Sequence, residues 1–207
     1  MNDVAVSGTQ GYAEEADNLV IQYESISFED VHGGSLQCFP SPPANLLDIG
    51  AGTGRDAAGF AALGYRVTAV EPTAELRNHA MKLHPSSDIE WIDDGLPDLE
   101  HISQRNERYH VVMLTAVWMH LDEGQRRRAM PRVCALIHPG GSMMLSLRHG
   151  PVPVGRRMFE VTAEETISLA SESGMVCVQR LEGDNALLGR PGVTWDHLTF
   201  RKEQPSG

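Results

Sequence analysis

Short apolar runs alternate along the chain with segments whose apolar residues recur at helical spacing. The segments with helical spacing predict helices at residues 12–26, 54–63, 74–83, 123–137 and 163–173. The apolar runs predict strands at residues 45–49, 65–70, 89–92, 110–115, 142–148, 175–182 and 194–201. Because strands and helices alternate, the pattern predicts an α/β fold with a parallel sheet and helices on both faces. The last two strands have no helix between them and can pair as an antiparallel hairpin.

The chain is long enough for one domain with a sizeable core. It has 207 residues, of which 41% are hydrophobic, and this fits a single domain with an extension. We assign residues 43–202 to the α/β domain, residues 1–42 to an N-terminal helical cap and residues 203–207 to a tail. No apolar stretch approaches the ~20 residues of a membrane span, and the N-terminus lacks the apolar block of a secretion signal. The three widely spaced cysteines show no disulfide framework, so we expect a cytoplasmic protein.

The charge of the chain makes some partners improbable. The formal net charge is −11 at pH 7, and such a surface repels nucleic-acid phosphates and anionic membranes. The densest basic run, Arg126-Arg127-Arg128, falls within a predicted helix, and we interpret it as a solvated helix face. We therefore expect neither nucleic acid nor a membrane as a partner. The sequence predicts no particular oligomeric state.

The most informative local pattern is a glycine-rich turn after the first predicted strand. The strand ends at Asp48-Ile49, and glycines follow at positions 50, 52 and 54. Seventeen residues after Gly54, the second predicted strand is followed by Glu71. A strand, a tight glycine turn, a helix and a second strand ending in an acid are typical of a nucleoside-binding site, in which the acid binds the ribose hydroxyls.

The spacing within this turn argues against a dinucleotide. A dinucleotide-binding turn has the spacing G-x-G-x-x-G, with a small third residue that lets helix and strand pack closely. Here the spacing is G-x-G-x-G, and the bulky Arg55 follows. Asp48 would repel a diphosphate and suits a ligand that carries an amine. An NAD-dependent oxidoreductase is therefore kept only as an alternative.

Residues 48–54, with the sequence DIGAGTG, resemble the first motif of class I methyltransferases, which use S-adenosylmethionine (SAM) and release S-adenosylhomocysteine (SAH). Residues 89–95 resemble the third strand of that family and its acid, and residues 109–121 resemble the fourth strand and the loop beside the methyl group. The resemblance covers residues 43–202. It implies a Rossmann-like sheet of seven mainly parallel strands with helices on both faces and an antiparallel last strand.

The resemblance also implies roles for individual residues. The glycine turn would hold the methionine part of SAM, Glu71 would bind both ribose hydroxyls, and Asp94 would face the adenine amino group. Tyr12 and Tyr23, in the first predicted helix, are candidates to cover the cofactor. The expected cofactor-binding residues are Tyr12, Asp48, Gly50, Ala51, Gly52, Arg55, Glu71, Pro72, Asp93, Asp94, Gly95, Thr115 and Ala116.

Two histidines are candidates for the proton acceptor of the reaction. His120 lies in the loop after the fourth strand, and His149 follows the fifth strand. An imidazole titrates near neutral pH and can take a proton from an oxygen or nitrogen nucleophile. The alternative for His120 is a structural role, in which it caps the next helix or packs under it. The nine histidines show no spacing with carboxylates that is typical of a metal site, so we expect no metal.

Cationic residues near the predicted pocket suggest a small acceptor that carries a negative charge. The loop after the fifth strand is rich in arginine, and arginine binds carboxylates and phosphates well. The expected substrate-binding residues are Trp118, Arg148, Arg156, Arg157 and Arg190. Trp118 can instead belong to the core, and the arginines can instead pair with surface acids. We therefore expect SAM-dependent methyl transfer to a small, anionic O- or N-nucleophile, with a catalytically silent SAM-binding regulatory module as a further alternative.

Overall fold

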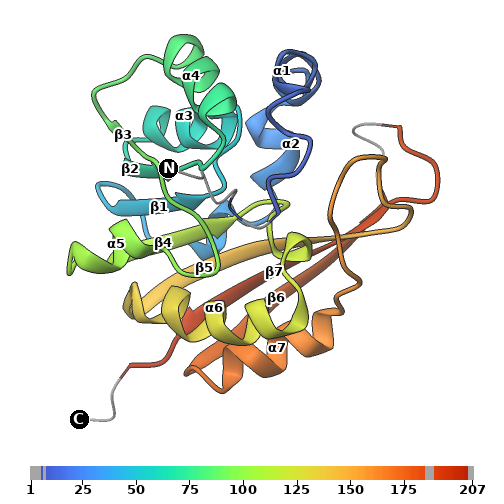
Figure 1. Ribbon diagram of the computed structural model, residues 1–207. Helices are drawn as coiled ribbons and strands as arrows, with labels where there is room; N and C mark the ends of the chain where they lie inside the picture. The colour runs from blue at the N-terminus through green and yellow to red at the C-terminus, as the bar shows by residue number, and fades with distance from the viewer. Residues whose placement is uncertain (1–5, 7, 185–188, 205–207) are drawn as a thin grey trace.

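The computed structural model describes residues 6, 8–184 and 189–204 of the chain. The expected tail at residues 203–207 and the N-terminal part of the expected cap therefore lie partly outside the described residues. Strands β1 to β7 form one sheet in the order β3-β2-β1-β4-β5-β7-β6 (Figure 1). The strands span Asn45–Ile49 (β1), Arg66–Val70 (β2), Ile89–Ile92 (β3), Tyr109–Leu114 (β4), Ile137–His149 (β5), Met175–Asp184 (β6) and Thr194–Lys202 (β7).

Among the described strands, β7 alone runs in the direction opposite to the other strands of the sheet. It pairs antiparallel with β5 and β6, whereas the pairs from β3 through β5 are parallel. This confirms the expected Rossmann-like sheet of seven mainly parallel strands with an antiparallel last strand. The main difference from the sequence prediction is that β5 begins at Ile137 rather than at residue 142. Ile137 pairs with Tyr109 before an irregularity in the register, and this lets β5 include the Pro139–Gly141 segment.

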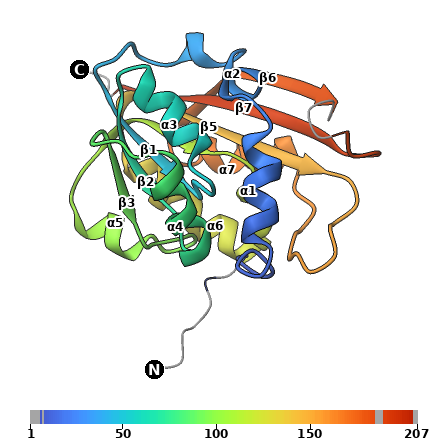
Figure 2. The same cartoon turned by 90° about the horizontal axis from the view of Figure 1, so that it is seen from above.

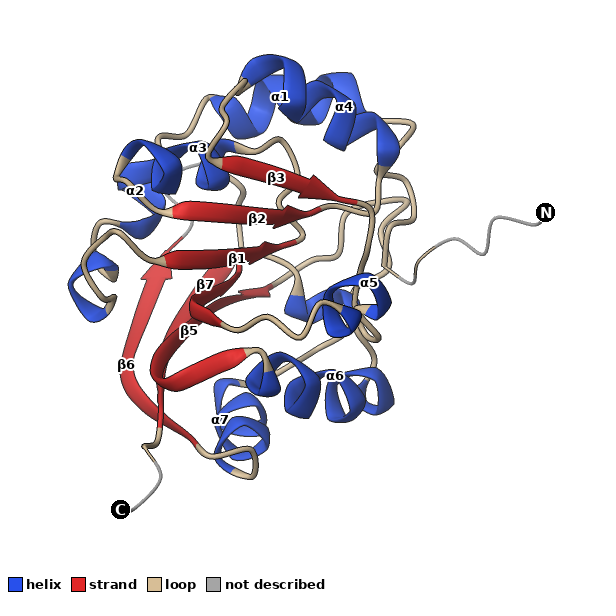
Figure 3. Cartoon of the chain, turned by 90° about the vertical axis from the view of Figure 1, so that its left-hand side faces the viewer, coloured by secondary structure: helices blue, strands red, loops and turns tan. Residues whose placement is uncertain are grey.

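Helices cover both faces of the sheet, with α1 to α4 on one face and α5 to α7 on the other (Figures 1 and 3). Among the described residues, no helix combines the length and the apolarity that crossing a bilayer requires. The α-helices span Ala16–Glu24 (α1), Phe28–His32 (α2), Arg55–Ala62 (α3), Ala74–Leu83 (α4), Glu100–Gln104 (α5), Glu123–Ala135 (α6) and Ala163–Ser171 (α7), and the 3-10 helices span Leu36–Cys38 (η1) and Trp118–His120 (η2).

The central strands β1, β2, β4 and β5 are largely buried on both faces, which explains why they appear in the sequence as continuous apolar runs. In β1, Leu46 packs with Phe28 of α2 and Phe60 of α3 on one face of the sheet. Leu47 and Ile49 point to the other face, where the core includes residues of α5, α6 and α7. The sheet is thus held between two apolar layers, and its strand ends are left to form a site.

The basic run of α6 is only in part the solvated face that the sequence suggested, because Arg127 and Arg128 are exposed and Arg126 is not. Arg126 is buried, with 3% of its surface exposed. Its Nε donates to Glu165 of α7 at 2.8 Å, and its NH1 donates to the main-chain oxygen of Leu121 at 2.6 Å. Arg127 alone of these three arginines makes an ion pair within the helix, with Glu123. Arg126 therefore joins α6 to α7, and the three arginines do not form one surface.

Candidate active site

A cavity of about 270 Å³ lies at the edge of the sheet where the parallel strands end. Its lining comes from the turn after β1, the residue after β2, the loops after β3 and β4, and the inner face of β5. The N-terminal segment also lines it, through Gly8, Thr9 and Tyr12. This is the edge at which open α/β sheets bind ligands, and every predicted motif leads to it.

The glycine turn after β1 has a backbone that other residues would strain. Gly50, Gly52 and Gly54 have φ angles of 75°, 57° and 87°, a region that L-residues rarely adopt. A Cβ on Gly50 would also lie 2.5 Å from Cγ2 of Val117. The N–H groups of Gly50 and Ala51 both donate to the main-chain oxygen of Val70, at 2.8 and 2.9 Å. The turn is therefore bound tightly to the end of β2.

Glu71 forms the second link between the turn and β2. Its Oε2 accepts a hydrogen bond from the N–H of Gly52 at 2.8 Å, and its Oε1 accepts one from the N–H of Thr73 at 2.7 Å. Burial raises the pKa of Glu71, and the two N–H groups partly offset this rise. The carboxylate is thus fixed in orientation where β2 ends, and it lines the cavity.

Asp48 is a buried acid without a partner. It is 1% exposed and lines the cavity, and neither carboxylate oxygen has a hydrogen-bond partner among the described residues. Burial raises the pKa of Asp48 well above its usual value, and the nearby Asp56 carboxylate raises it further, while Arg55 partly offsets the rise. A buried carboxylate without a hydrogen bond is costly. The geometry therefore favours a ligand that brings a donor or a positive charge to Asp48.

Arg55 begins α3 and lines the same part of the cavity. Its Nε donates to Asp56 Oδ1 at 2.7 Å, and its NH1 reaches the main-chain oxygen of Tyr23 at 3.4 Å. The sequence left open whether Arg55 reaches the cofactor or pairs with Asp56, and the structure shows the ion pair with Asp56. Arg55 nevertheless remains at the cavity wall, next to Asp48.

The loop after β3 contributes Gly95 and Leu96 to the cavity, together with Pro72 from the loop after β2. Asp94 and Asp93, which the resemblance also assigns to the cofactor, lie outside the lining. The Asp94 carboxylate accepts hydrogen bonds from the N–H groups of Gly95 and Ile102, at 2.8 and 2.9 Å. Main-chain donors therefore fix its orientation. Asp93 is exposed and pairs with Arg77.

The loop after β4 divides its residues between the cavity and the core. Thr115 and Ala116 line the cavity, and the N–H of Ala116 donates to Oγ of Ser146 on β5 at 2.8 Å. Trp118 is fully buried in the apolar core and lies outside the lining, which corrects its placement among the substrate residues. The short η2 turn that begins at Trp118 brings His120 to the cavity wall.

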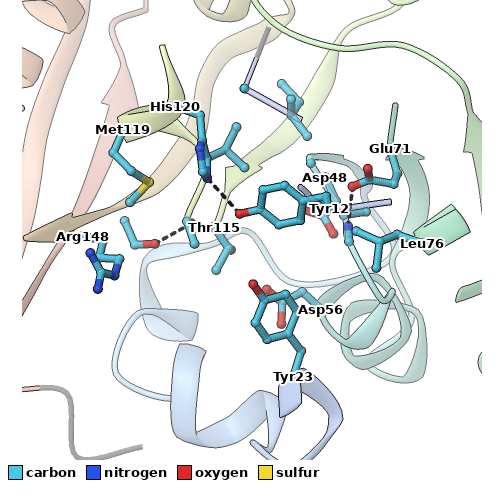
Figure 4. A pocket seen from close by; sticks show the side chains of 18 of the residues that line it. Tyr12, Tyr23, Asp48, Asp56, Glu71, Leu76, Thr115, Met119, His120 and Arg148 are labelled. Atoms are coloured by element: carbon cyan, nitrogen blue, oxygen red, sulfur yellow. Dashed lines mark hydrogen bonds between the residues drawn. The ribbon is translucent and has the colours of Figure 1, made fainter. Parts of the chain in front are cut away.

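His120 and Tyr12 meet in the cavity, as Figure 4 shows. The Tyr12 hydroxyl lies 3.0 Å from Nε2 of His120, and Nδ1 of His120 lies 2.7 Å from the main-chain oxygen of Arg157. The two side chains belong to segments more than a hundred positions apart in the sequence. His120 does not cap the next helix, because the N-cap of α6 is Asp122, and His120 lines the cavity.

The adjacent residues Arg148 and His149 point to opposite faces of β5. Arg148 lines the cavity and is 8% exposed, and its Nε has no hydrogen-bond partner among the described residues. Burial lowers the pKa of Arg148, and the nearby Arg190 lowers it further. His149 lies outside the lining, where its Nε2 pairs with Asp196 Oδ2 at 3.0 Å. The structure therefore places His120, and not His149, at the wall of this cavity.

The other three arginines lie outside the cavity lining, and each is held by partners on other segments. Arg156 pairs with Glu15 at 2.7 Å, and its guanidinium lies over the Tyr12 ring, 4.1 Å from the ring centre. Arg157 pairs with Asp122, and Arg190 donates to Oε1 of Gln22. The loop after β5 lies beside the N-terminal segment, as Figure 2 shows. These arginines therefore hold together segments around the cavity, and Arg148 is the one of the four predicted arginines that lines it.

Several lining residues were not predicted from the sequence. Ser146 of β5 lies directly across from His197 of β7, and Arg148 lies directly across from Trp195. His197 and Trp195 line the cavity, and burial lowers the pKa of His197. The signal that places them is the register between β5 and β7, which needs the assembled sheet. Met158 reaches the cavity from the loop after β5.

Comparisons with known proteins agree with this geometry. A family model described as a methyltransferase domain matches residues 28–175, so the chain belongs to that family. This membership confirms the resemblance to class I methyltransferases. Comparison with curated protein sequences gave no match.

Solved structures of three bacterial methyltransferases share the fold. The 1,6-didemethyltoxoflavin-N1-methyltransferase of Burkholderia thailandensis, with its substrate and SAH bound, aligns with a TM-score of 0.70 and 20% identity over 93% of this chain and 86% of that chain. N-methyltransferase NodS of Bradyrhizobium japonicum, with SAH, gives 0.67 and 18% over 94% and 98%. Magnesium protoporphyrin IX methyltransferase of Synechocystis, with SAM, gives 0.67 and 12% over 97% and 88%.

Proposed function

We propose that the chain binds SAM in this cavity and transfers its methyl group to a small, anionic acceptor through an oxygen or nitrogen atom. One observation carries the proposal: a buried, unpartnered carboxylate, that of Asp48, lies beside a glycine turn whose end is fixed by a second carboxylate, that of Glu71. The first fits the ammonium group of the methionine part, and the second fits the ribose hydroxyls. Family membership supports the same assignment.

The residues present fit each part of this cofactor. Gly50 and Gly52 provide backbone without side chains beside Asp48, where the methionine part would lie. Pro72, Gly95 and Leu96 form an apolar wall next to Glu71, which suits a flat adenine ring. When bound, SAM supplies a methyl group that its positive sulfur has already activated. The protein then has to orient the acceptor, exclude water and accept a proton where the nucleophile carries one.

The closed end of the cavity supports the exclusion of water. The N-terminal segment crosses the cavity through Gly8 and Tyr12, and Met158 contributes an apolar side chain from the opposite loop. The ion pair between Arg156 and Glu15 ties these two segments together. Alignment of reactants in such a site contributes on the order of 7–11 kcal/mol to a rate. Most of the expected catalysis would therefore come from position rather than from a special chemical group.

Arg148 supports the negative charge that we assign to the acceptor. It is a buried guanidinium whose Nε lacks a partner, and among the described residues no carboxylate pairs with it. Burying a charge without a partner is costly, and a bound carboxylate or phosphate removes that cost by forming charge-assisted hydrogen bonds. Arg148 also lies close enough to His120 to lower the pKa of its imidazole. An anion held there would place its nucleophile near His120.

The activity can be tested with SAM that is labelled in the methyl group. We expect label to move to small acids that bear a hydroxyl or amino group, and we expect little transfer to their uncharged analogues. SAH binding without transfer to any acceptor would favour the silent binding module. Saturable enhancement of NADH fluorescence that SAH does not reverse would favour the oxidoreductase instead.

A further inference from the structure

His120 is held between two hydrogen-bond partners that fix its tautomer. Its Nδ1 faces the main-chain oxygen of Arg157 at 2.7 Å, and its Nε2 faces the Tyr12 hydroxyl at 3.0 Å (Figure 4). A carbonyl oxygen only accepts hydrogen bonds, so Nδ1 carries the proton of the neutral ring. Nε2 is then bare, and it accepts the hydrogen bond that the Tyr12 hydroxyl donates.

The surroundings of His120 keep its ring neutral. Burial lowers the pKa of His120, and the hydrogen bond to the Arg157 carbonyl opposes this in part. The guanidinium groups of Arg156, Arg148 and Arg157 lower the pKa further. They reach the ring from β5 and from the loop that follows it. The acids that pair with two of these arginines are Glu15 and Asp122.

The Tyr12 hydroxyl stands at the one nitrogen of His120 that can take a proton. Burial raises the pKa of Tyr12, and the adjacent Tyr23 raises it further, so the hydroxyl keeps its proton. Gly8 packs against the side of His120, because a Cβ on Gly8 would lie 2.8 Å from the Cβ of His120. The lone pair of His120 Nε2 is therefore already occupied by the Tyr12 hydroxyl, so an acceptor in the cavity would contact the Tyr12 oxygen first.

We propose that Tyr12 and His120 form a proton relay, in which Tyr12 takes the proton of the acceptor's nucleophile and passes its own proton to His120. This inference rests on the proposed function. It changes the expected role of Tyr12 from a cover over the cofactor to a group that touches the reacting atom. It also explains why the cavity has a histidine whose basic nitrogen is already hydrogen-bonded.

The relay balances in protons and electrons. The bond between the nucleophile and its hydrogen breaks, and the hydrogen binds Oη of Tyr12 as the original Oη–H proton binds the lone pair of Nε2. The electron pair left on the nucleophile forms its bond to the methyl carbon, and the pair of the broken carbon–sulfur bond stays on sulfur. His120 becomes an imidazolium whose Nδ1–H still donates to Arg157, and it later releases one proton to water.

The relay predicts a specific defect in Tyr12→Phe. This variant keeps the ring under Arg156 and removes only the hydroxyl. We expect kcat to fall by about 100-fold for acceptors with an O–H or N–H nucleophile, with SAH affinity within about twofold of the wild type. Acceptors that react through an ionised carboxylate have no proton to lose and should keep their kcat. Tyr65→Phe removes another tyrosine hydroxyl, one that donates to Pro40 outside the cavity, and should change neither value.

Two further readouts separate a relay from a structural contact. Long-range proton–nitrogen NMR of the free protein should show His120 protonated at Nδ1 and bare at Nε2, and in Tyr12→Phe only the Nε2 resonance should move. In kinetics, Tyr12→Phe combined with His120→Gln should be no slower than the slower single variant, because both act on one step.

The outcomes distinguish the relay from the proposed function itself. A His120 that is protonated at Nε2 overturns the relay, and so does an unchanged kcat in Tyr12→Phe with intact SAH binding. Strictly additive losses in the double variant overturn it as well. Wild-type protein that neither binds SAH nor transfers a methyl group overturns the proposed function instead.

Discussion

The cofactor half and the acceptor half of the cavity are built in different ways. In the cofactor half, Asp48, Gly52 and Glu71 come from one strand–turn–helix–strand unit, and main-chain N–H groups fix the Glu71 carboxylate. In the acceptor half, Tyr12, His120 and Arg148 come from distant segments, and contacts between side chains hold the first two. The difference teaches that the half with a local sequence motif is held by the backbone. The half that we assign to the acceptor depends on tertiary packing.

The largest expected effect comes from Glu71→Ala, which breaks the backbone-held half. The variant would lose the two hydrogen bonds that the ribose hydroxyls donate to the Glu71 carboxylate. It would also lose the hydrogen bonds that the N–H groups of Gly52 and Thr73 donate to Glu71. We expect SAH affinity to fall by about 1,000-fold, or about 4 kcal/mol, as measured by calorimetry. Thermal unfolding should confirm that the variant is folded. An affinity that changes less than about tenfold would contradict the role of Glu71.

Arg148→Met tests the acceptor half alone. The substitution keeps the length of the side chain and removes its charge, so the KM for an anionic acceptor should rise by about 100-fold. SAH affinity should stay within about twofold, and the melting temperature should not fall, because an unpartnered buried charge has been removed. Arg127→Gln, at an exposed ion pair on α6, is the matched control. A KM that is unchanged in Arg148→Met would remove Arg148 from substrate binding.

Asp48→Asn should separate stability from binding in the cofactor half. Because burial raises the pKa of Asp48 in the folded protein, the wild type loses stability as pH rises from the unfolded pKa of about 4 through the folded value. The variant lacks this loss, so its melting temperature should gain on that of the wild type over the same range. SAH affinity should fall by about tenfold. If the melting temperatures of the two proteins change in parallel with pH, Asp48 stays ionised in the folded protein and the prediction is contradicted.

The smallest effect is expected at Asp93 and His149, two of the predicted site residues that lie outside the cavity lining. Asp93→Asn and His149→Gln remove an exposed ion pair with Arg77 and a contact with Asp196. Exposed pairs contribute about 0–1 kcal/mol, so SAH affinity and kcat should both stay within about twofold of the wild type. A tenfold loss of kcat in His149→Gln would return this histidine to the mechanism.

The sequence predicted most of the fold because its signals are local. The bounds of β1, β3 and α4 were predicted to the residue, since each is a continuous or periodic apolar segment bordered by polar residues. The helices α2 and α5 are not among the predicted helices, because five residues are too few to show a helical period. The bulged start of β5 depends on its pairing with Tyr109, which no local pattern reveals.

The site was predictable where a motif fixes both residue and orientation. Asp48, the glycine turn and Glu71 line the cavity as expected. Asp94 does not, because its orientation is decided by the N–H of Ile102 on the short helix α5. Likewise, only packing decides that Trp118 enters the core. The opposite directions of Arg148 and His149 follow from the alternation of side chains along a strand, which the predicted strand at residues 142–148 already implies.

Calorimetric titration of SAH into the folded wild-type chain, in buffers of different ionisation enthalpy, tests the central claim most directly. The account predicts saturable binding at one site with release of protons, because the ammonium group of the ligand lowers the raised pKa of Asp48. It also predicts that Glu71→Ala abolishes this heat. Folded protein that gives no binding heat in any buffer would contradict the account, as would wild-type binding that Glu71→Ala leaves unchanged.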